Sequence, residues 1–118
     1  SASSLFLSFR TMFDPARAGD LTATIGFRIG KERFLVRIAG GRLTAERRSF
    51  DTADAVFTGA APAIAAMVYG GVPATAMIDA GALAIDGDRA LADRFAGLFP
   101  LPEKAEPAGA EDRDPAQR

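Results

Sequence analysis

Between residues 21 and 48 the apolar side chains recur with a period of two, and this pattern narrows the possible folds more than any other feature of the chain. Successive side chains of a β-strand point to opposite faces, so this period indicates a strand with one buried face. The first strand is predicted from apolar residues that alternate with polar or small ones: Leu21, Ala23, Ile25, Phe27 and Ile29.

Two glycine-containing turns continue this pattern into a meander. Gly30-Lys31-Glu32 is predicted to form a hairpin loop, and the alternation resumes over residues 34–38. Gly40-Gly41 is a stronger signal, because the type I′ turn of a two-residue hairpin requires a positive φ at both central positions. A third, more polar strand is predicted over residues 42–48. The segment therefore predicts three consecutive antiparallel strands.

The first 13 residues follow a helical period instead. The apolar residues at this spacing are Leu5, Phe6, Phe9, Met12 and Phe13. Ser3 or Ser4 can cap the helix, and Asp14-Pro15 is expected to end it, because proline disfavours helical backbone at the preceding residue. We favour a helix that packs against the core. The alternative is a connector from an upstream domain, or a helix on a dimer face.

Short strands and helices alternate over the rest of the ordered chain. Strands are predicted over residues 55–58 and 83–85, and helices over 62–69, 73–80 and 88–99. Proline fits the first turn of a helix, glycine ends a helix, and aspartate is a good N-cap. The pattern predicts a mixed domain of five strands and several helices, with an antiparallel meander of three strands at its start.

The domain limits follow from composition. Residues 1–14 are predicted as an N-terminal helix or connector, and residues 15–101 as the folded domain. Residues 102–118 are predicted as a disordered tail, because Pro, Ala, Gly and charged residues bury too little apolar surface to offset the entropy of ordering. Because the chain does not begin with Met, we expect it to be a piece of a longer protein.

Composition excludes several kinds of chemistry. The chain has no histidine and no cysteine, so it lacks the commonest general base, thiolate nucleophiles and disulfides. Its net charge of −1 favours neither nucleic acid nor an anionic membrane. No apolar run approaches the roughly 20 residues of a membrane span, and the start lacks the basic region of a signal peptide. We expect a cytoplasmic domain that is not an enzyme and holds no metal or cofactor.

The clustered acids have a simpler explanation than metal binding. Asp79, Asp86, Asp88 and Asp93 lack the alternating ligand pattern of a calcium loop. We interpret them as helix-end, strand-end and capping residues.

The basic and aromatic candidates are also weak. Arg42, Arg47 and Arg48 fall on one polar strand without interleaved aromatic residues, which favours a solvated sheet face over nucleic-acid contact. Tyr69 is the only tyrosine, and a tyrosine in an apolar pocket can move protons with an acidic partner. A hydroxyl that meets water at a helix end is the favoured interpretation.

The order of small and apolar residues from Asp54 onward resembles the sterol carrier protein type 2 domain. The resemblance rests on Asp54-Ala55-Val56-Phe57-Thr58-Gly59, Pro62-Ala63, Gly70, Pro73, Ala76, Gly81, Leu83, Ile85, Gly87-Asp88, Leu91, Phe95 and Phe99. Residues 27–30 and 38–43 fit its early strands. One position departs from the pattern: eukaryotic members often carry a lysine where this chain has Ala82. A basic contact for an anionic head group is therefore missing there.

The resemblance implies an α/β (α+β) fold with a five-stranded, mostly antiparallel sheet that is covered by helices. It also implies a hydrophobic tunnel between the sheet and the helices. Members of the family bind sterols, fatty acids, acyl-CoAs or other lipids, without a cofactor or a catalytic residue. The residues expected to contact a hydrophobic ligand are Ile25, Phe27, Phe34, Val36, Ile64, Met67, Val68, Met77, Ile78, Ile85, Phe95 and Phe99.

Residues 97–103 also resemble bacterial members that are fused behind a winged-helix DNA-binding domain. This implies the ligand-sensing C-terminal domain of a transcriptional regulator. Such a domain would contact DNA only through a missing N-terminal domain, and a homodimer is a further expectation.

Two alternatives stay open. The same apolar residues would fill a close-packed core, which would make the domain a dimerisation module without a ligand. The second alternative is a small isomerase-like enzyme that uses Tyr69. Composition and spacing do not separate a hollow core from a full one.

Overall fold

The computed structural model describes residues 2–100, and the predicted tail at residues 102–118 lies outside the described residues. Helices and strands follow one another as α1 (Ala2–Met12), α2 (Pro15–Ala18), β1 (Ala23–Ile29), β2 (Glu32–Ala39), β3 (Arg42–Arg47), β4 (Ala55–Gly59), α3 (Ala61–Val68), α4 (Ala74–Asp79), β5 (Leu83–Gly87) and α5 (Arg89–Ala96).

The five strands form one mixed sheet in the order β3-β2-β1-β4-β5. β1, β2 and β3 pair antiparallel, as the period-two segment predicts, with Ile25 opposite Val36 and Phe27 opposite Phe34. β4 lies on the other side of β1 and runs parallel to it, and β5 pairs antiparallel with β4. The prediction of a five-stranded, mostly antiparallel sheet covered by helices is confirmed.

The turn between β2 and β3 has the backbone geometry that its two glycines predict. Gly40 and Gly41 have φ values of 58° and 75°, as a type I′ turn requires. The first hairpin is tighter than its sequence indicates. Ile29 pairs directly with Glu32, so Glu32 belongs to β2 and only Gly30 and Lys31 form the turn.

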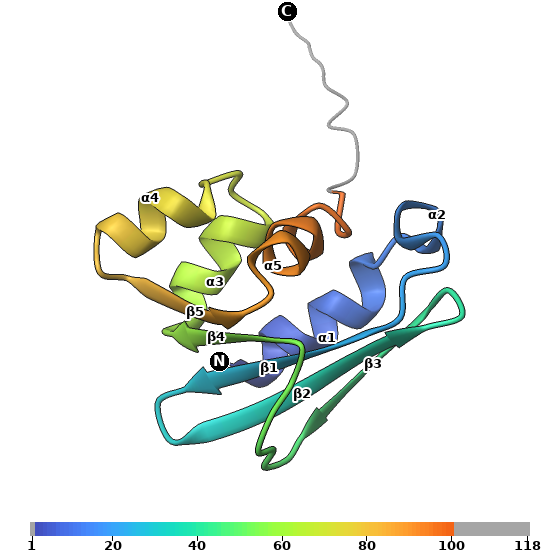
Figure 1. The fold of residues 1–118 in the computed structure, drawn as a ribbon, viewed down its shortest axis with the longest axis horizontal. Coiled ribbons are helices and arrows are strands. Elements are labelled where there is room, and N and C mark those ends of the chain that lie inside the picture. The colour runs from blue at the N-terminus through green and yellow to red at the C-terminus, as the bar shows by residue number, and fades with distance from the viewer. Residues whose placement is uncertain (1, 101–118) are drawn as a thin grey trace, which may run out of the picture.

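The connection from β3 to β4 crosses the outer face of the sheet (Figure 1). Phe50, within this connection, packs over Gly26 of β1 so closely that a Cβ atom at Gly26 would overlap the ring. The guanidinium of Arg28 lies 5.3 Å from the centre of the same ring. The glycine in the middle of β1 is therefore explained by the segment that passes over it.

The inner face of the sheet is covered by α1 on one side and by α3, α4 and α5 over the β4–β5 end (Figure 1). Phe6 of α1 stacks on Phe34, with ring centres 4.1 Å apart, and Phe27 stacks on Phe57 at 5.3 Å. Phe9 lies between these groups and has no exposed surface. These aromatic contacts form the centre of the hydrophobic core.

α1 is thus a core helix, which was the favoured interpretation of its pattern. Its buried residues Leu5, Phe6 and Phe9 belong to the same core cluster as those of the sheet. The domain limits at residues 14 and 101 stay a prediction. Asp14 does not simply end a helix. Its carboxylate accepts a hydrogen bond from the Ala16 N–H at 2.9 Å and caps the one-turn helix α2, which the sequence analysis did not predict.

Candidate functional site

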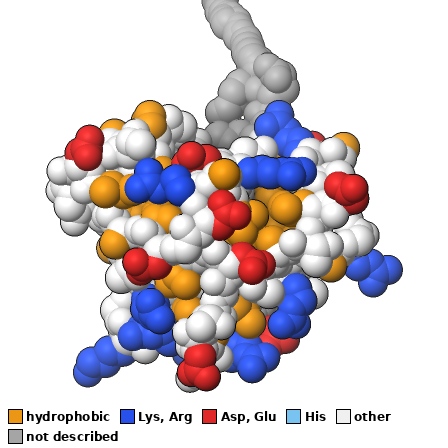
Figure 2. All heavy atoms as spheres, in the orientation of Figure 1, with side chains coloured by type: hydrophobic (Ala, Val, Ile, Leu, Met, Phe, Trp, Pro, Cys, Tyr) orange, Lys and Arg blue, Asp and Glu red, His pale blue; other side chains and the backbone are white. Residues whose placement is uncertain are grey.

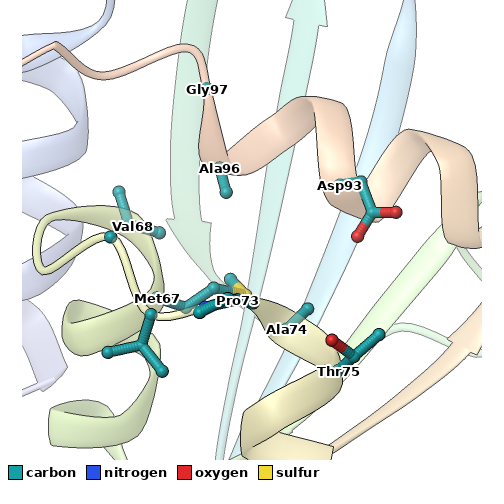
Figure 3. A pocket seen from close by; sticks show the side chains of 10 residues that line it. Met67, Val68, Pro73, Ala74, Thr75, Asp93, Ala96 and Gly97 are labelled. Carbon is teal, nitrogen blue, oxygen red and sulfur yellow. The ribbon is translucent and has the colours of Figure 1, made fainter.

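An open groove of about 480 Å³ lies between α3, α4 and α5 (Figure 3). Small ligands commonly occupy concave, mostly apolar sites of roughly 300–1,000 Å³. The residues that line the groove are Met67, Val68, Gly71, Val72, Pro73, Ala74, Thr75, Asp93, Ala96 and Gly97.

The α3–α4 connection forms one wall because two glycines turn the chain sharply after α3. Gly70 donates its N–H to the Ala66 carbonyl at 2.9 Å, and a Cβ at Gly70 would lie 2.7 Å from that oxygen. Gly71 has a φ of 72°, in the region that favours glycine. Pro73 then precedes α4 with a φ of −60° and ends the connection.

The opposite wall is α5, which is fixed at both ends. At its start the Asp88 carboxylate accepts a hydrogen bond from the Leu91 N–H at 3.0 Å, so the predicted N-cap is confirmed. At its end Arg94 donates to the Ala18 carbonyl at 2.9 Å, and Arg17 donates to the Gly97 carbonyl at 3.0 Å. The groove is therefore held between well-anchored elements.

Small side chains keep the groove open, and two polar side chains lie on its walls. Ala96 of α5 points toward the start of α4, where Met67 and Pro73 lie beside Ala74 (Figure 3). Asp93 of α5 and Thr75 of α4 lie on the same side of this view, on opposite walls of the groove (Figure 3). The site can hold an apolar chain along its length and offers a carboxylate and a hydroxyl.

Several residues predicted to contact a ligand are packed instead in a filled part of the interior. A residue that lined a space large enough for water would keep accessible surface there, and these residues keep none: Ile25, Phe27, Val36, Ile64 and Phe95. They lie in the same cluster as Phe9 of α1. The expected tunnel does not pass between these side chains, because aromatic rings from α1 occupy that space.

The other predicted ligand residues lie in different places. Met67 and Val68 line the groove. Ile78 and Ile85 line a second open groove of about 600 Å³ at the β5 edge, and Phe34 borders a third of about 300 Å³ between α1 and β3.

Two further members of the predicted set lie close to the aromatic core. Met77 of α4 is half-buried against the core, and Phe99 is buried beside Phe9. The structure thus distributes the predicted set over a core and three grooves, and its role in ligand binding stays a prediction.

Sequence reasoning missed most of the groove. Val72, Asp93, Ala96 and Gly97 were not among the predicted ligand residues. The available signal was the Gly-Gly-x-Pro sequence at residues 70–73, which indicates a wide turn between two helices.

Apolar side chains also reach the surface in several other places among charged side chains of both signs (Figure 2). Leu7 of α1 is the large hydrophobic side chain that residues 2–100 leave exposed, at 60%. Arg47 is not simply solvated, because it lies 5.6 Å from the centre of the Phe34 ring and forms an ion pair with Glu32 at 3.4 Å.

Tyr69 does not offer its hydroxyl to a ligand. Its oxygen lies 2.8 Å from Ser8 Oγ, and Ser8 Oγ donates to the Leu5 carbonyl at 2.6 Å. Because the serine proton is already used, the tyrosine O–H donates to Ser8. Burial raises the pKa of Tyr69 above 10.0, and the hydrogen bond between Tyr69 and Ser8 opposes this in part.

Within residues 2–100, no group of three or more His, Cys, Asp or Glu side chains is placed to hold a metal ion. No helix in this part of the chain has the length and apolar character that crossing a membrane demands.

Comparison with solved structures identifies the class of fold. The inverting sec-alkylsulfatase Pisa1 from Pseudomonas sp. matches 87% of this chain with a TM-score of 0.80 and 19% identity. The ubiquinone synthesis protein UbiJ-SCP2 matches 82% of this chain and 90% of its own length, with a TM-score of 0.67 and 15% identity. Sterol carrier protein 2 from Aedes aegypti, solved with palmitate, matches 84% of this chain and 96% of its own, at 0.59 and 20%.

The fold is therefore that of the sterol carrier protein 2 class, and the resemblance seen in the sequence is confirmed at the level of the fold. The chain belongs to the alkyl sulfatase C-terminal family, whose model matches residues 1–105. It spans only 17% of the length of the Pisa1 chain. A comparison with curated protein sequences finds no significant match.

Proposed function

We propose that this chain binds a hydrophobic small molecule whose apolar chain lies in the groove between α3, α4 and α5. The observation that carries the proposal is the groove itself. Its floor is formed by Met67 and Val68, its walls carry the small side chains of Ala74 and Ala96, and it measures about 480 Å³. A flexible thioether such as Met67 adapts readily to ligands of different shape.

The comparisons support an alkyl or lipid ligand. The matching family is named for the C-terminal part of alkyl sulfatases. One structural neighbour was solved with a C16 fatty acid. We propose that the chain supplies apolar binding to a larger protein of the alkyl sulfatase type and does not itself catalyse. In support, the chain has no histidine or cysteine, and Tyr69 is hydrogen-bonded to Ser8.

The regulator context expected from the sequence is a different proposal. The match to an enzyme family favours an alkyl sulfatase as the larger protein over a winged-helix regulator. The expectations of DNA contact through an upstream domain, of a homodimer and of a cytoplasmic location stay predictions.

The dimerisation alternative receives less support. It requires a large apolar surface on α1, but Leu5, Phe6 and Phe9 of this helix are buried in the domain's own core. The one large exposed hydrophobic side chain within residues 2–100 is Leu7. A single leucine falls short of the apolar centre that a stable interface needs.

Filling the groove should abolish binding. We expect Ala96→Trp, which places a large ring between α5 and α4, to weaken binding of a fluorescent fatty acid by more than about tenfold, since it removes most of the buried apolar contact. Ala90→Trp is the matched control, because Ala90 lies on the same helix, is exposed and does not line the groove. Fluorescence titration of both variants and the unmodified chain measures the dissociation constants.

The length of the ligand gives a second readout of the same experiment. Each buried CH₂ contributes roughly 0.8 kcal/mol, so two added carbons should tighten binding by about tenfold until the groove is full. The proposal is overturned if the unmodified chain shows no saturable binding, or if Ala96→Trp and Ala90→Trp bind alike.

A further inference from the structure

The charged group that lines the groove is an acid. Of the groove's lining residues, Asp93 alone carries a charge, and none is Lys or Arg. Thr75 adds a hydroxyl on the opposite wall of the groove (Figure 3). A ligand seated there meets a negative charge, a hydroxyl and apolar contacts.

No ion pair within residues 2–100 neutralises this charge. In this part of the chain Asp93 forms no hydrogen bond either. Arg89, one turn earlier on α5, borders the separate groove at the β5 edge. Arg94, the next residue, donates to the Ala18 carbonyl at 2.9 Å. The Asp93 carboxylate is therefore free to act on whatever enters the groove.

We infer that the groove selects neutral amphiphiles that carry a hydroxyl head group over amphiphiles with an anionic head group. This inference rests on the binding function proposed above. A hydroxyl can donate a charge-assisted hydrogen bond to the Asp93 carboxylate. A sulfate or carboxylate head group has no proton to donate at neutral pH, and its charge is repelled by Asp93.

A preference for hydroxyl over anionic head groups would separate the product of an alkyl sulfatase from its substrate. Hydrolysis of an alkyl sulfate, R–OSO₃⁻ + H₂O → R–OH + HSO₄⁻, leaves the alkyl chain unchanged and replaces an anionic head group with a hydroxyl. The groove would therefore hold the alcohol product in preference to the sulfate ester. It would act as an acceptor for the product and not as a site that concentrates the substrate.

Ligands of equal chain length separate the effect of the head group on binding affinity from the effect of the apolar chain. Decan-1-ol, decyl sulfate and decanoate, below the concentrations at which they aggregate, compete with the neutral fluorophore N-phenyl-1-naphthylamine for the chain. We expect decan-1-ol to bind about fivefold tighter than decyl sulfate, the size expected for an exposed charge. Raising NaCl from about 10 mM to about 1 M should narrow this difference, because salt screens the repulsion.

Two variants with the same change in net charge locate the effect. Asp93→Asn should bring the affinities for decan-1-ol and decyl sulfate to within about twofold of each other. Asp79→Asn should leave the difference unchanged, because Asp79 is exposed at the end of α4 and does not line the groove.

The outcomes are distinct. If none of the three ligands displaces the fluorophore from the unmodified chain, the proposed binding function fails and the selectivity fails with it. If the ligands bind but decyl sulfate binds as tightly as decan-1-ol or tighter, the selectivity alone is overturned. The same holds if Asp93→Asn and Asp79→Asn behave alike.

Discussion

At the scale of single residues, the hydroxyl pair of Tyr69 and Ser8 shows how a chemically suggestive side chain can have a structural role. The Tyr69 O–H donates to Ser8, which donates in turn to the Leu5 carbonyl. This chain of hydrogen bonds joins the end of α3 to α1. It leaves Tyr69 without an acidic partner among its hydrogen bonds, and the isomerase alternative receives no support from its surroundings.

The same pair predicts a dependence of stability on pH. The folded-state pKa of Tyr69 is raised above its unfolded value of 10.0, so its neutral form is favoured in the folded state. The contribution to stability is complete below pH 10.0 and is lost as pH rises through the higher folded-state pKa. Tyr69→Phe should lower the free energy of unfolding by about 1 kcal/mol at neutral pH through the lost hydrogen bond.

Urea unfolding at neutral pH and above pH 10.0 measures both effects. Above pH 10.0 the Tyr69→Phe variant should lose less of its free energy of unfolding than the unmodified chain, because it has no tyrosine to ionise. Because Tyr69 is the only tyrosine and the chain has no tryptophan, the ultraviolet absorbance of tyrosinate reports its titration directly. A transition in the folded chain at or below the ordinary value for tyrosine would contradict the account.

At the scale of elements, α1 decides whether the interior is hollow. Phe9 projects from this helix into the centre of the aromatic cluster, within 6 Å of the ring centres of Phe27, Phe95 and Phe99. A helix that fills the space above β1 and β2 moves any ligand site outward. The open groove lies instead where α3, α4 and α5 meet through small side chains.

Substitutions on the buried and exposed faces of α1 should therefore have very different effects on the free energy of unfolding. Phe9→Leu should destabilise the domain by about 1–2 kcal/mol, because it leaves space in a close-packed cluster. Leu7→Ala, on the exposed face of the same helix, should change the free energy of unfolding by less than about 0.5 kcal/mol. Urea unfolding of both variants is the measurement, and equal effects would show that α1 does not belong to the core.

At the scale of the whole molecule, a single small domain combines a filled core with grooves at its surface. A ligand that binds only the folded state stabilises it by RT ln(1 + [L]/Kd), which is about 2.7 kcal/mol at one hundred times Kd. For a domain of this size, that should raise the unfolding midpoint by about 10 °C. Decan-1-ol is the ligand with which we test this expected rise in the unfolding midpoint.

Thermal unfolding followed by circular dichroism, with and without decan-1-ol, checks this expectation. Ala96→Trp should show little or no shift, whereas Ala90→Trp should respond like the unmodified chain. A similar rise in the midpoint for both variants would place the ligand outside the groove.

The elements were largely predictable because each depends on local geometry. Period two in residues 21–48 gave the three antiparallel strands, Gly40-Gly41 their second turn, and Asp88 the start of α5. The one-turn helix α2 was missed because four residues carry too short a pattern to recognise.

The site was less predictable, since which apolar residues face a groove and which fill a core depends on packing. Ile25 and Phe27 have the same residue types and spacing that a tunnel wall would need, yet they are fully buried. The sequence pattern gave Asp93 only a structural interpretation, as one of four clustered acids. It became a candidate selector of head groups only because the turn at Gly70-Gly71 brings α4 opposite it.

By itself, the amino-acid sequence determined the strands, most of the helices and the turns, because hydrophobic period, proline and glycine act over a few residues. It also carried the resemblance to sterol carrier protein domains. Only the tertiary structure decided where the interior is full and where it is open. That outcome depends on how the volumes of Phe6 and Phe9 from one end of the chain meet the small side chains of α4 and α5 from the other, and close packing of distant segments leaves no signature in local sequence.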